Sequence, residues 1–103
     1  MRGRIEILMS GVNFGEVYAL IIREQGPARA HNAVNELRRL PMSLVDASWH
    51  RCCDAAEIKV RYKLGYADAF AAALAVEHKA TLVTSDSDFR KLGHDFPVLW
   101  LRH

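Results

Sequence analysis

Two aspartates directly follow a short apolar segment near the end of the chain and are the first candidates for chemistry. Residues 81–84 have the composition of a buried strand, and Asp86 and Asp88 come immediately after it. In open α/β sheets, ligands bind beyond the carboxyl ends of the strands, so this position favours a functional role. The same segment also suits a turn into a short helix, with Asp86 or Ser87 as its N-cap. The sequence alone supports the functional role and the capping role equally.

A third aspartate, Asp68, stands at the start of an alanine-rich stretch. The helical repeat places Ala71, Ala72 and Ala75 beside it, so its carboxylate has shallow, uncrowded surroundings. An acid in the first turn of a helix also interacts favourably with the helix dipole, by about 0.3 to 1 kcal/mol. Taken alone, Asp68 fits this structural role better than a functional one.

Glu16 is a further acidic residue, in an upstream amphipathic stretch. It lies away from the apolar repeat formed by Phe14, Val17, Tyr18 and Ile21. Periodicity alone therefore makes Glu16 a solvated residue on the polar face of a helix.

Other reactive residue types match no known motif. His50 lies near Cys52 and Cys53, but adjacent cysteines on a helix point in different directions and lack the C-x2-C spacing of zinc sites. Trp49 and Trp100 are not interleaved with lysine or arginine, so no base-stacking platform is evident and we expect both in the core. The sequence has no Gly-rich phosphate loop, Gly-x-Ser-x-Gly elbow or His-Glu-x-x-His motif.

The elements that must position these residues alternate between strands and helices. The predicted strands cover 5–10, 42–47, 80–84 and 97–101, and the predicted helices cover 13–24, 28–40, 49–62, 66–79 and one turn at 89–92. For 5–10, a helix is almost as plausible. Ser48 is the expected N-cap of the third helix and Gly65 its expected end. This order predicts an α/β fold with a mainly parallel sheet.

Composition limits the number of domains and the class of protein. The 103 residues suffice for one domain, and 50% hydrophobic with 25% charged residues is typical of a folded protein rather than a disordered one. The net charge of +2 permits a polyanionic partner without indicating one. Adjacent Cys52 and Cys53 form no disulfide framework, and no apolar run suits a membrane span or a signal peptide. We therefore expect a cytoplasmic protein.

Two segments together resemble the C-terminal half of PIN-domain ribonucleases, especially the VapC-type toxins of bacterial toxin-antitoxin pairs. They are Gly65-Tyr-Ala-Asp-Ala-Phe-Ala-Ala-Ala-Leu-Ala75 and Leu82-Val-Thr-Ser-Asp-Ser-Asp-Phe89. Upstream, residues 10–18, Ser-Gly-Val-Asn-Phe-Gly-Glu-Val-Tyr, are similar to the second acidic motif of that family. The resemblance covers essentially the whole chain. It implies a PIN-like three-layer α/β/α sandwich with a mainly parallel sheet, as a single domain over 1–103.

The activity that this resemblance implies is that of a Mg²⁺- or Mn²⁺-dependent endoribonuclease. By motif, Glu16, Asp68 and Asp86 would bind the metal and act in catalysis, and Asp88 would be an accessory acid. Mg²⁺ prefers oxygen ligands and is usually held by one or two carboxylates together with substrate phosphate. The residues implied around these ligands are Asn13, Thr84 and Ser85. The implied partners are RNA, a cognate antitoxin and a second copy in a homodimer.

One part of the family pattern has no counterpart. A PIN domain begins with a strand that ends in an aspartate, the first metal ligand, and nothing ahead of Glu16 matches it. That strand would lie between 5–10 and 80–84 in the sheet. We therefore expect an N-terminally truncated PIN-like domain. Its alternative function is that of an inactive PIN remnant, which binds an antitoxin or another PIN protomer. A third possibility is an α/β scaffold with some other role, in which case the combined occurrence of the two segments would be a coincidence.

Overall fold

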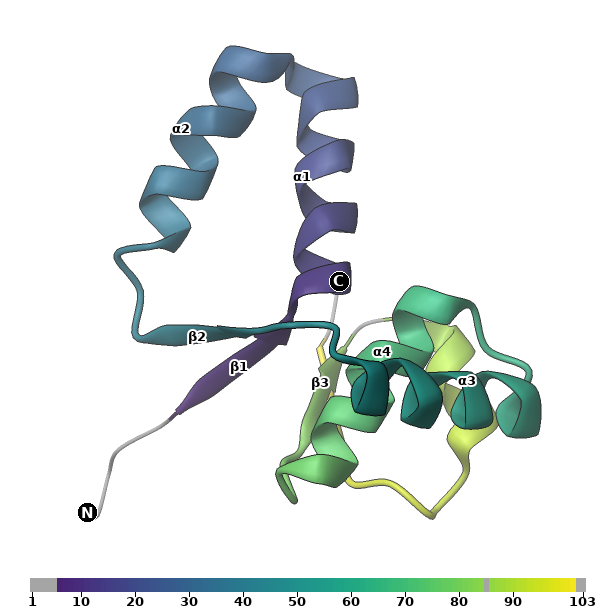
Figure 1. Ribbon diagram of the computed structural model, residues 1–103. Coiled ribbons are helices and arrows are strands. Elements are labelled where there is room, and N and C mark those ends of the chain that lie inside the picture. The colour runs from purple at the N-terminus through teal and green to yellow at the C-terminus, as the bar shows by residue number, and fades with distance from the viewer. Residues whose placement is uncertain (1–5, 85, 102–103) are drawn as a thin grey trace. The chain divides into compact units, whose positions relative to one another are not determined.

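The computed structural model describes residues 6–84 and 86–101 (Figure 1). The chain divides into two compact units, which we call unit 1 (Met1–Asp46) and unit 2 (Ala47–His103). Each unit contains parallel strands separated in sequence by helices, as the α/β prediction requires.

Unit 1 has the element order strand, helix, helix, strand. Its elements are β1 (Ile7–Ser10), α1 (Gly11–Gln25), α2 (Pro27–Leu37) and β2 (Met42–Val45). The two strands pair in parallel, with Ile7 opposite Met42 and Ser10 opposite Val45. In Figure 1, α1 and α2 form a helical hairpin. The structure thus resolves the ambiguity of the first segment in favour of a strand.

Local capping sets the ends of the two helices in unit 1. The Ser10 hydroxyl accepts a hydrogen bond from the Val12 N–H at 3.1 Å, so α1 begins before the predicted start at residue 13. Gly26 has φ 88°, which its missing side chain permits, and the chain turns there into Pro27 at the start of α2. The second helix ends at Leu37 rather than residue 40, because Arg38 is its C-cap.

Unit 2 contains three helices and a second pair of strands. Its elements are α3 (Trp49–Tyr62), α4 (Tyr66–Glu77), β3 (Leu82–Thr84), the 3-10 helix η1 (Ser87–Leu92) and β4 (Val98–Trp100). The strands β3 and β4 pair in parallel, with Leu82 opposite Val98 and Thr84 opposite Trp100. The strands β1 and β3 belong to different two-stranded sheets.

The third helix has the predicted bounds and the predicted N-cap. The Ser48 hydroxyl accepts a hydrogen bond from the Arg51 N–H at 3.3 Å. The expected role of Gly65 is wrong, because Lys63, with φ 57° and ψ 44°, caps the end of α3. Leu64 is 2% exposed and enters the core directly after α3, so the chain turns before it reaches Gly65. Gly65 is instead the N-cap residue of α4.

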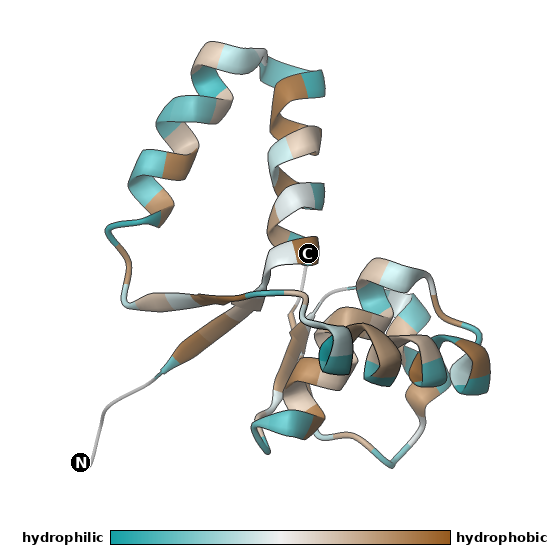
Figure 2. Cartoon of the chain, in the orientation of Figure 1, coloured by the Kyte–Doolittle hydropathy of each residue, from teal (hydrophilic) through white to brown (hydrophobic). Residues whose placement is uncertain are grey.

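The core of unit 2 is built around the alanine-rich helix. Buried side chains from α4, β3 and η1 meet there together with the residue after the C-cap of α3; the cluster comprises Leu64, Ala72, Ala75, Leu82, Phe89 and Leu92. Figure 2 shows α4 as apolar along most of its length. The small side chains of Ala72 and Ala75 let neighbouring elements approach closely, and apolar area removed from water stabilises the cluster.

The tryptophans do not contribute to this core, so their predicted packing role is wrong. Trp49 is 92% exposed at the start of α3, and Trp100 is 41% exposed at the end of β4. The core cluster consists instead of alanines, leucines and Phe89. Among the described helices, none is both long enough and apolar enough to cross a bilayer.

Candidate metal centre

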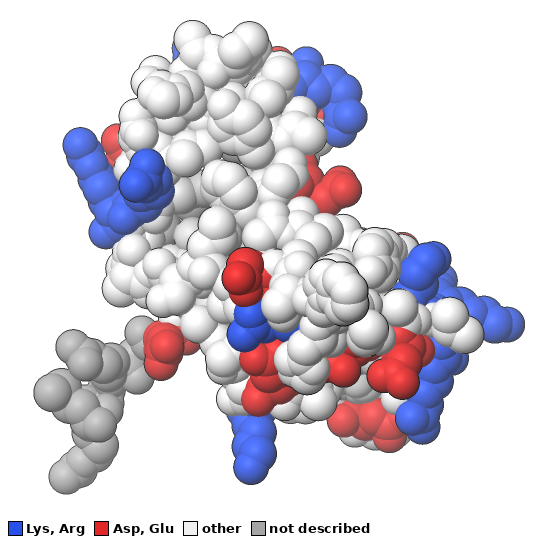
Figure 3. Space-filling view, viewed as in Figure 1, with Lys and Arg blue, Asp and Glu red and all other residues white. Residues whose placement is uncertain are grey.

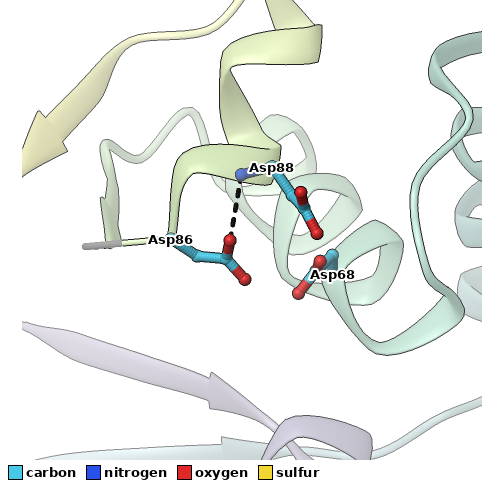
Figure 4. Close-up of side chains that lie close together, drawn as sticks. All are labelled: Asp68, Asp86 and Asp88. Carbon is cyan, nitrogen blue, oxygen red and sulfur yellow. Dashed lines mark hydrogen bonds between the residues drawn. The ribbon is translucent and has the colours of Figure 1, made fainter.

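Three aspartates of unit 2 converge on one point (Figure 4). One carboxylate oxygen each from Asp68, Asp86 and Asp88 lies within 4.8 Å of the others. Asp68 comes from the first turn of α4 and is half-buried, whereas Asp86 and Asp88 come from the start of η1 and are exposed. The fold thus brings together acids that the sequence separates by the whole of α4 and β3.

The loop between β3 and η1 is held by a short series of hydrogen bonds. The Thr84 hydroxyl accepts a bond from the Asp86 N–H at 3.0 Å, and Oδ1 of Asp86 accepts one from the Asp88 N–H at 2.9 Å. Asp86 is therefore the N-cap of η1, as one of the two interpretations predicted. A functional role of Asp86 is compatible with this cap, because the capping bond uses Oδ1 and the carboxylate has a second oxygen.

Core packing explains why this loop faces Asp68. Phe89 and Leu92 of η1 are 5% and 1% exposed, and they pack in the same cluster as Ala72 of α4. Because η1 is fixed to α4 by these apolar contacts, its first turn is set beside the first turn of that helix. The small alanines near Asp68 therefore allow the close approach that gathers the three carboxylates.

Two acids of unit 2 outside the cluster pair with basic side chains. Glu77 accepts two hydrogen bonds from Arg51, at 3.1 and 3.0 Å, and Asp54 lies 3.4 Å from a nitrogen of His50. Figure 3 likewise shows acidic and basic side chains next to one another on unit 2. No lysine or arginine of the described residues forms an ion pair with Asp86 or Asp88. Carboxylates this close repel one another, and a bound cation would relieve that repulsion.

The donor set suits a hard divalent cation. All three side chains offer carboxylate oxygens, with no histidine or cysteine in the group that the described residues form. Mg²⁺ and Mn²⁺ favour oxygen ligands, whereas zinc sites are usually built from cysteine and histidine. The residues present therefore fit Mg²⁺ or Mn²⁺.

The remaining predicted site residues come from both units. Glu16 is exposed and Asn13 is half-buried on α1 of unit 1, and a role for them at this centre stays a prediction. Thr84 bonds to the loop through its hydroxyl, as described above. Ser85 lies outside the described residues.

Sequence reasoning missed one feature near the aspartates. The Arg90 guanidinium carbon lies 5.4 Å from the centroid of the Trp100 ring. The two residues come from η1 and β4 and are not close in sequence, so no periodic pattern joins them. The signal that could have found them is strand pairing, because it places Trp100 opposite Thr84, at the start of the acidic loop.

Comparison with known proteins identifies the family. The sequence matches the PIN domain family over residues 1–95, a range that includes unit 1 and most of unit 2. The chain belongs to the PIN domain family. No curated protein matches this PIN domain significantly. Its fold is similar to that of a chain in the crystal structure of VapBC2 from Rickettsia felis bound to a DNA fragment from their promoter, at 16% sequence identity and a TM-score of 0.72. That similarity covers 91% of this chain and 74% of the other.

These findings confirm the family resemblance and the PIN-like α/β fold that it implied. PIN domains generally use divalent metal ions, and the cluster of Asp68, Asp86 and Asp88 is an acidic group of this PIN domain that could hold one.

Proposed function

We propose that this PIN domain is an endoribonuclease of the VapC toxin type that depends on Mg²⁺ or Mn²⁺. The observation that carries the proposal is the convergence of Asp68, Asp86 and Asp88 within 4.8 Å, in a member of the PIN domain family. Three carboxylates held this close, two of them without a lysine or arginine partner among the described residues, repel one another, so a role in binding a cation accounts for their arrangement.

Each residue has a distinct task in this proposal. Asp68 and Asp86 bind the ion directly, and Asp88 holds a ligand water or completes the set as an accessory acid. The bond from the Asp86 N–H to Thr84 fixes the loop, so Asp86 keeps its position when the substrate arrives. Glu16 is assigned to the ligand set by its motif, with Asn13 and Ser85 as neighbouring polar groups. When bound, the ion polarises the phosphodiester and neutralises charge on the leaving oxygen.

The same charges explain why a bound metal should strengthen RNA binding. The phosphates of RNA are repelled by three clustered carboxylates, and that repulsion falls once a divalent cation is bound. The carboxylates therefore bind and orient the ion, and through it they control access of the phosphate. Removal of the metal is expected to weaken RNA binding as well as cleavage.

A partner protein is the second element of the proposal. No residue of α1, all of which the structure describes, is buried, and Val17, Leu20 and Ile22 are 37%, 46% and 37% exposed. Apolar side chains grouped on one helix suit a protein interface. The similar structure is of VapBC2, and we propose that this chain binds a cognate antitoxin. We further propose that it forms a homodimer. We propose that the chain and its antitoxin are cytoplasmic, because the free Cys52 and Cys53 stay reduced in that compartment.

An inactive protein-binding module is the alternative function, and the exposed apolar side chains of α1 are the observation that favours it. The two functions differ in whether they require a metal ion. The endoribonuclease needs Mn²⁺ or Mg²⁺ at the aspartates, whereas the module binds its partner without either ion.

The test is RNA cleavage by the purified chain with Mg²⁺, Mn²⁺ or EDTA. We expect cleavage with either ion, none with EDTA, and a loss of at least about 100-fold in rate for Asp68→Asn, because one charged ligand is removed. Asp54→Asn is the matched control, since Asp54 pairs with His50 outside the cluster. Cleavage by Asp68→Asn at the unchanged rate, or cleavage in EDTA, would refute the assignment.

A further inference from the structure

Arg90 and Trp100 form an exposed pair in unit 2. The guanidinium carbon of Arg90 lies 5.4 Å from the centroid of the indole ring, within the range of a cation–π contact. Trp100 is 41% exposed and Arg90 is exposed as well. No carboxylate of the described residues pairs with this guanidinium, so its charge is not neutralised by the part of the chain that the structure describes. The pair thus offers a flat aromatic surface beside a positive charge.

Its position links it to the three aspartates. Trp100 lies opposite Thr84 in the parallel pairing of β3 and β4, and the Leu101 N–H donates to the Thr84 carbonyl at 2.8 Å. The Thr84 hydroxyl in turn accepts the hydrogen bond from the Asp86 N–H. Arg90 stands on η1, the helix whose first turn carries Asp88. Both members of the pair are therefore fixed to the same short loop that carries the acids.

We propose that Arg90 and Trp100 form a nucleotide subsite, in which an unpaired base stacks on Trp100 and a phosphate next to the cleaved one pairs with Arg90. This inference rests on the endoribonuclease proposed above. Aromatic rings stack with bases of any identity, and the planar arginine fork matches the oxygens of a phosphate. The arginine also supplies positive charge beside an acidic cluster that on its own repels RNA.

The chemistry of the subsite selects the class of RNA. The bases of a duplex are stacked on one another and present no free face, whereas the bases of a single strand or a loop can be unstacked onto an aromatic side chain. The subsite therefore favours single-stranded RNA over a duplex of the same sequence. Because stacking is tolerant of base identity, it sets the position of the strand rather than its sequence.

The two tryptophans of the chain, Trp49 and Trp100, allow a direct test by fluorescence. In the full-length variant Trp49→Phe, Trp100 is the remaining tryptophan. A single-stranded RNA oligonucleotide is titrated into it in EDTA at low salt, where metal-dependent cleavage does not occur. We expect saturable quenching of Trp100 emission, and much weaker quenching by the matching duplex. The control is Trp100→Phe, in which the emission of Trp49 should stay unchanged.

The second arm measures affinity. In the Trp49→Phe background, Arg90→Ala should raise the Kd for the single strand about tenfold, because it removes the phosphate contact and the partner that orients the ring. Arg90→Lys keeps the charge and should recover part of the affinity. Since Arg90 is exposed, the thermal midpoint of each variant should match that of its parent. Trp100 emission that does not respond to RNA, or an Arg90→Ala Kd equal to the parent value, would overturn the subsite.

Cleavage assays test the nucleotide subsite separately from the proposed endoribonuclease activity. If Trp100 responds to single-stranded RNA but the chain cleaves none with Mg²⁺ or Mn²⁺, the subsite stands and the endoribonuclease fails. If the chain cleaves RNA and Arg90→Ala leaves KM and kcat unchanged, the endoribonuclease stands and the subsite fails. A rise in KM with little change in kcat is the result that the subsite predicts.

Discussion

The two units of this PIN domain differ in how they bury apolar side chains. In unit 2, Leu64, Phe89 and Leu92 are 5% exposed or less. Among the described residues of unit 1, the buried side chains are those of Ser10 and Ala30, while Leu20 and other large apolar residues remain about half exposed. Unit 2 therefore holds its aspartates with a packed core. Unit 1 relies on caps and strand pairing, and its exposed apolar side chains are where we propose that a partner binds.

The largest expected effect comes from truncating matched leucines in the two units. Leu92 is 1% exposed, so Leu92→Ala should lower the free energy of unfolding by about 2 to 5 kcal/mol, because it leaves a cavity in the core. Leu20 is 46% exposed, so Leu20→Ala should cost less than about 1 kcal/mol. Urea unfolding of both variants measures the difference. Equal losses would contradict the contrast between the units.

A smaller effect is expected from the N-cap serines. Ser10→Ala removes the bond to the Val12 N–H in unit 1, and Ser48→Ala removes the bond to the Arg51 N–H in unit 2. Each loss should cost about 1 kcal/mol. Because unit 1 has little core to hold α1, Ser10→Ala should speed amide hydrogen exchange throughout that helix, whereas Ser48→Ala should affect only the first turn of α3. Exchange confined to the first turn in both variants would count against this account.

The smallest effect concerns the Arg51–Glu77 pair of unit 2. Two hydrogen bonds from Arg51 hold the pKa of the Glu77 carboxyl below its ordinary value of 4.5. A pKa lowered by folding adds stability above the unfolded value and loses it as the pH falls through the folded value. Glu77→Gln should therefore show a slightly weaker loss of stability below about pH 4.5 than the parent. Glu36→Gln, at the exposed Arg39–Glu36 pair of unit 1, is the control and should follow the parent curve.

Sequence alone was sufficient where the determinants were local. The bounds of α3 and its Ser48 cap were predicted correctly, because a periodic apolar face and a capping hydroxyl are both readable within a few residues. The residue that closes the helix was not predicted, because Gly65 was expected in that role and Lys63 is the C-cap. Lys63 takes a left-handed conformation that depends on burial of Leu64, and burial is a property of the folded unit.

The candidate site likewise combines features that the local sequence predicts with features that depend on tertiary packing. The acids were visible as a family motif, and the capping role of Asp86 was one of two interpretations that local chemistry allowed. That Asp68 meets Asp86 and Asp88 depends on packing of η1 against α4, which no pattern along the chain reports. The contact between Arg90 and Trp100 depends on the register of β3 with β4, so the tryptophan was wrongly expected in the core.

The most direct test of the central claim is calorimetric titration of the chain with Mn²⁺, compared with Asp86→Asn and the control Asp54→Asn. The asparagine keeps the oxygen that caps η1 and removes one charge of the cluster. In EDTA its thermal midpoint should equal or exceed that of the parent, because repulsion is relieved. We predict saturable Mn²⁺ binding by the parent and by Asp54→Asn, and binding at least about tenfold weaker by Asp86→Asn. A parent chain that binds no Mn²⁺, or an Asp86→Asn chain that binds it as tightly as the parent, would contradict the account.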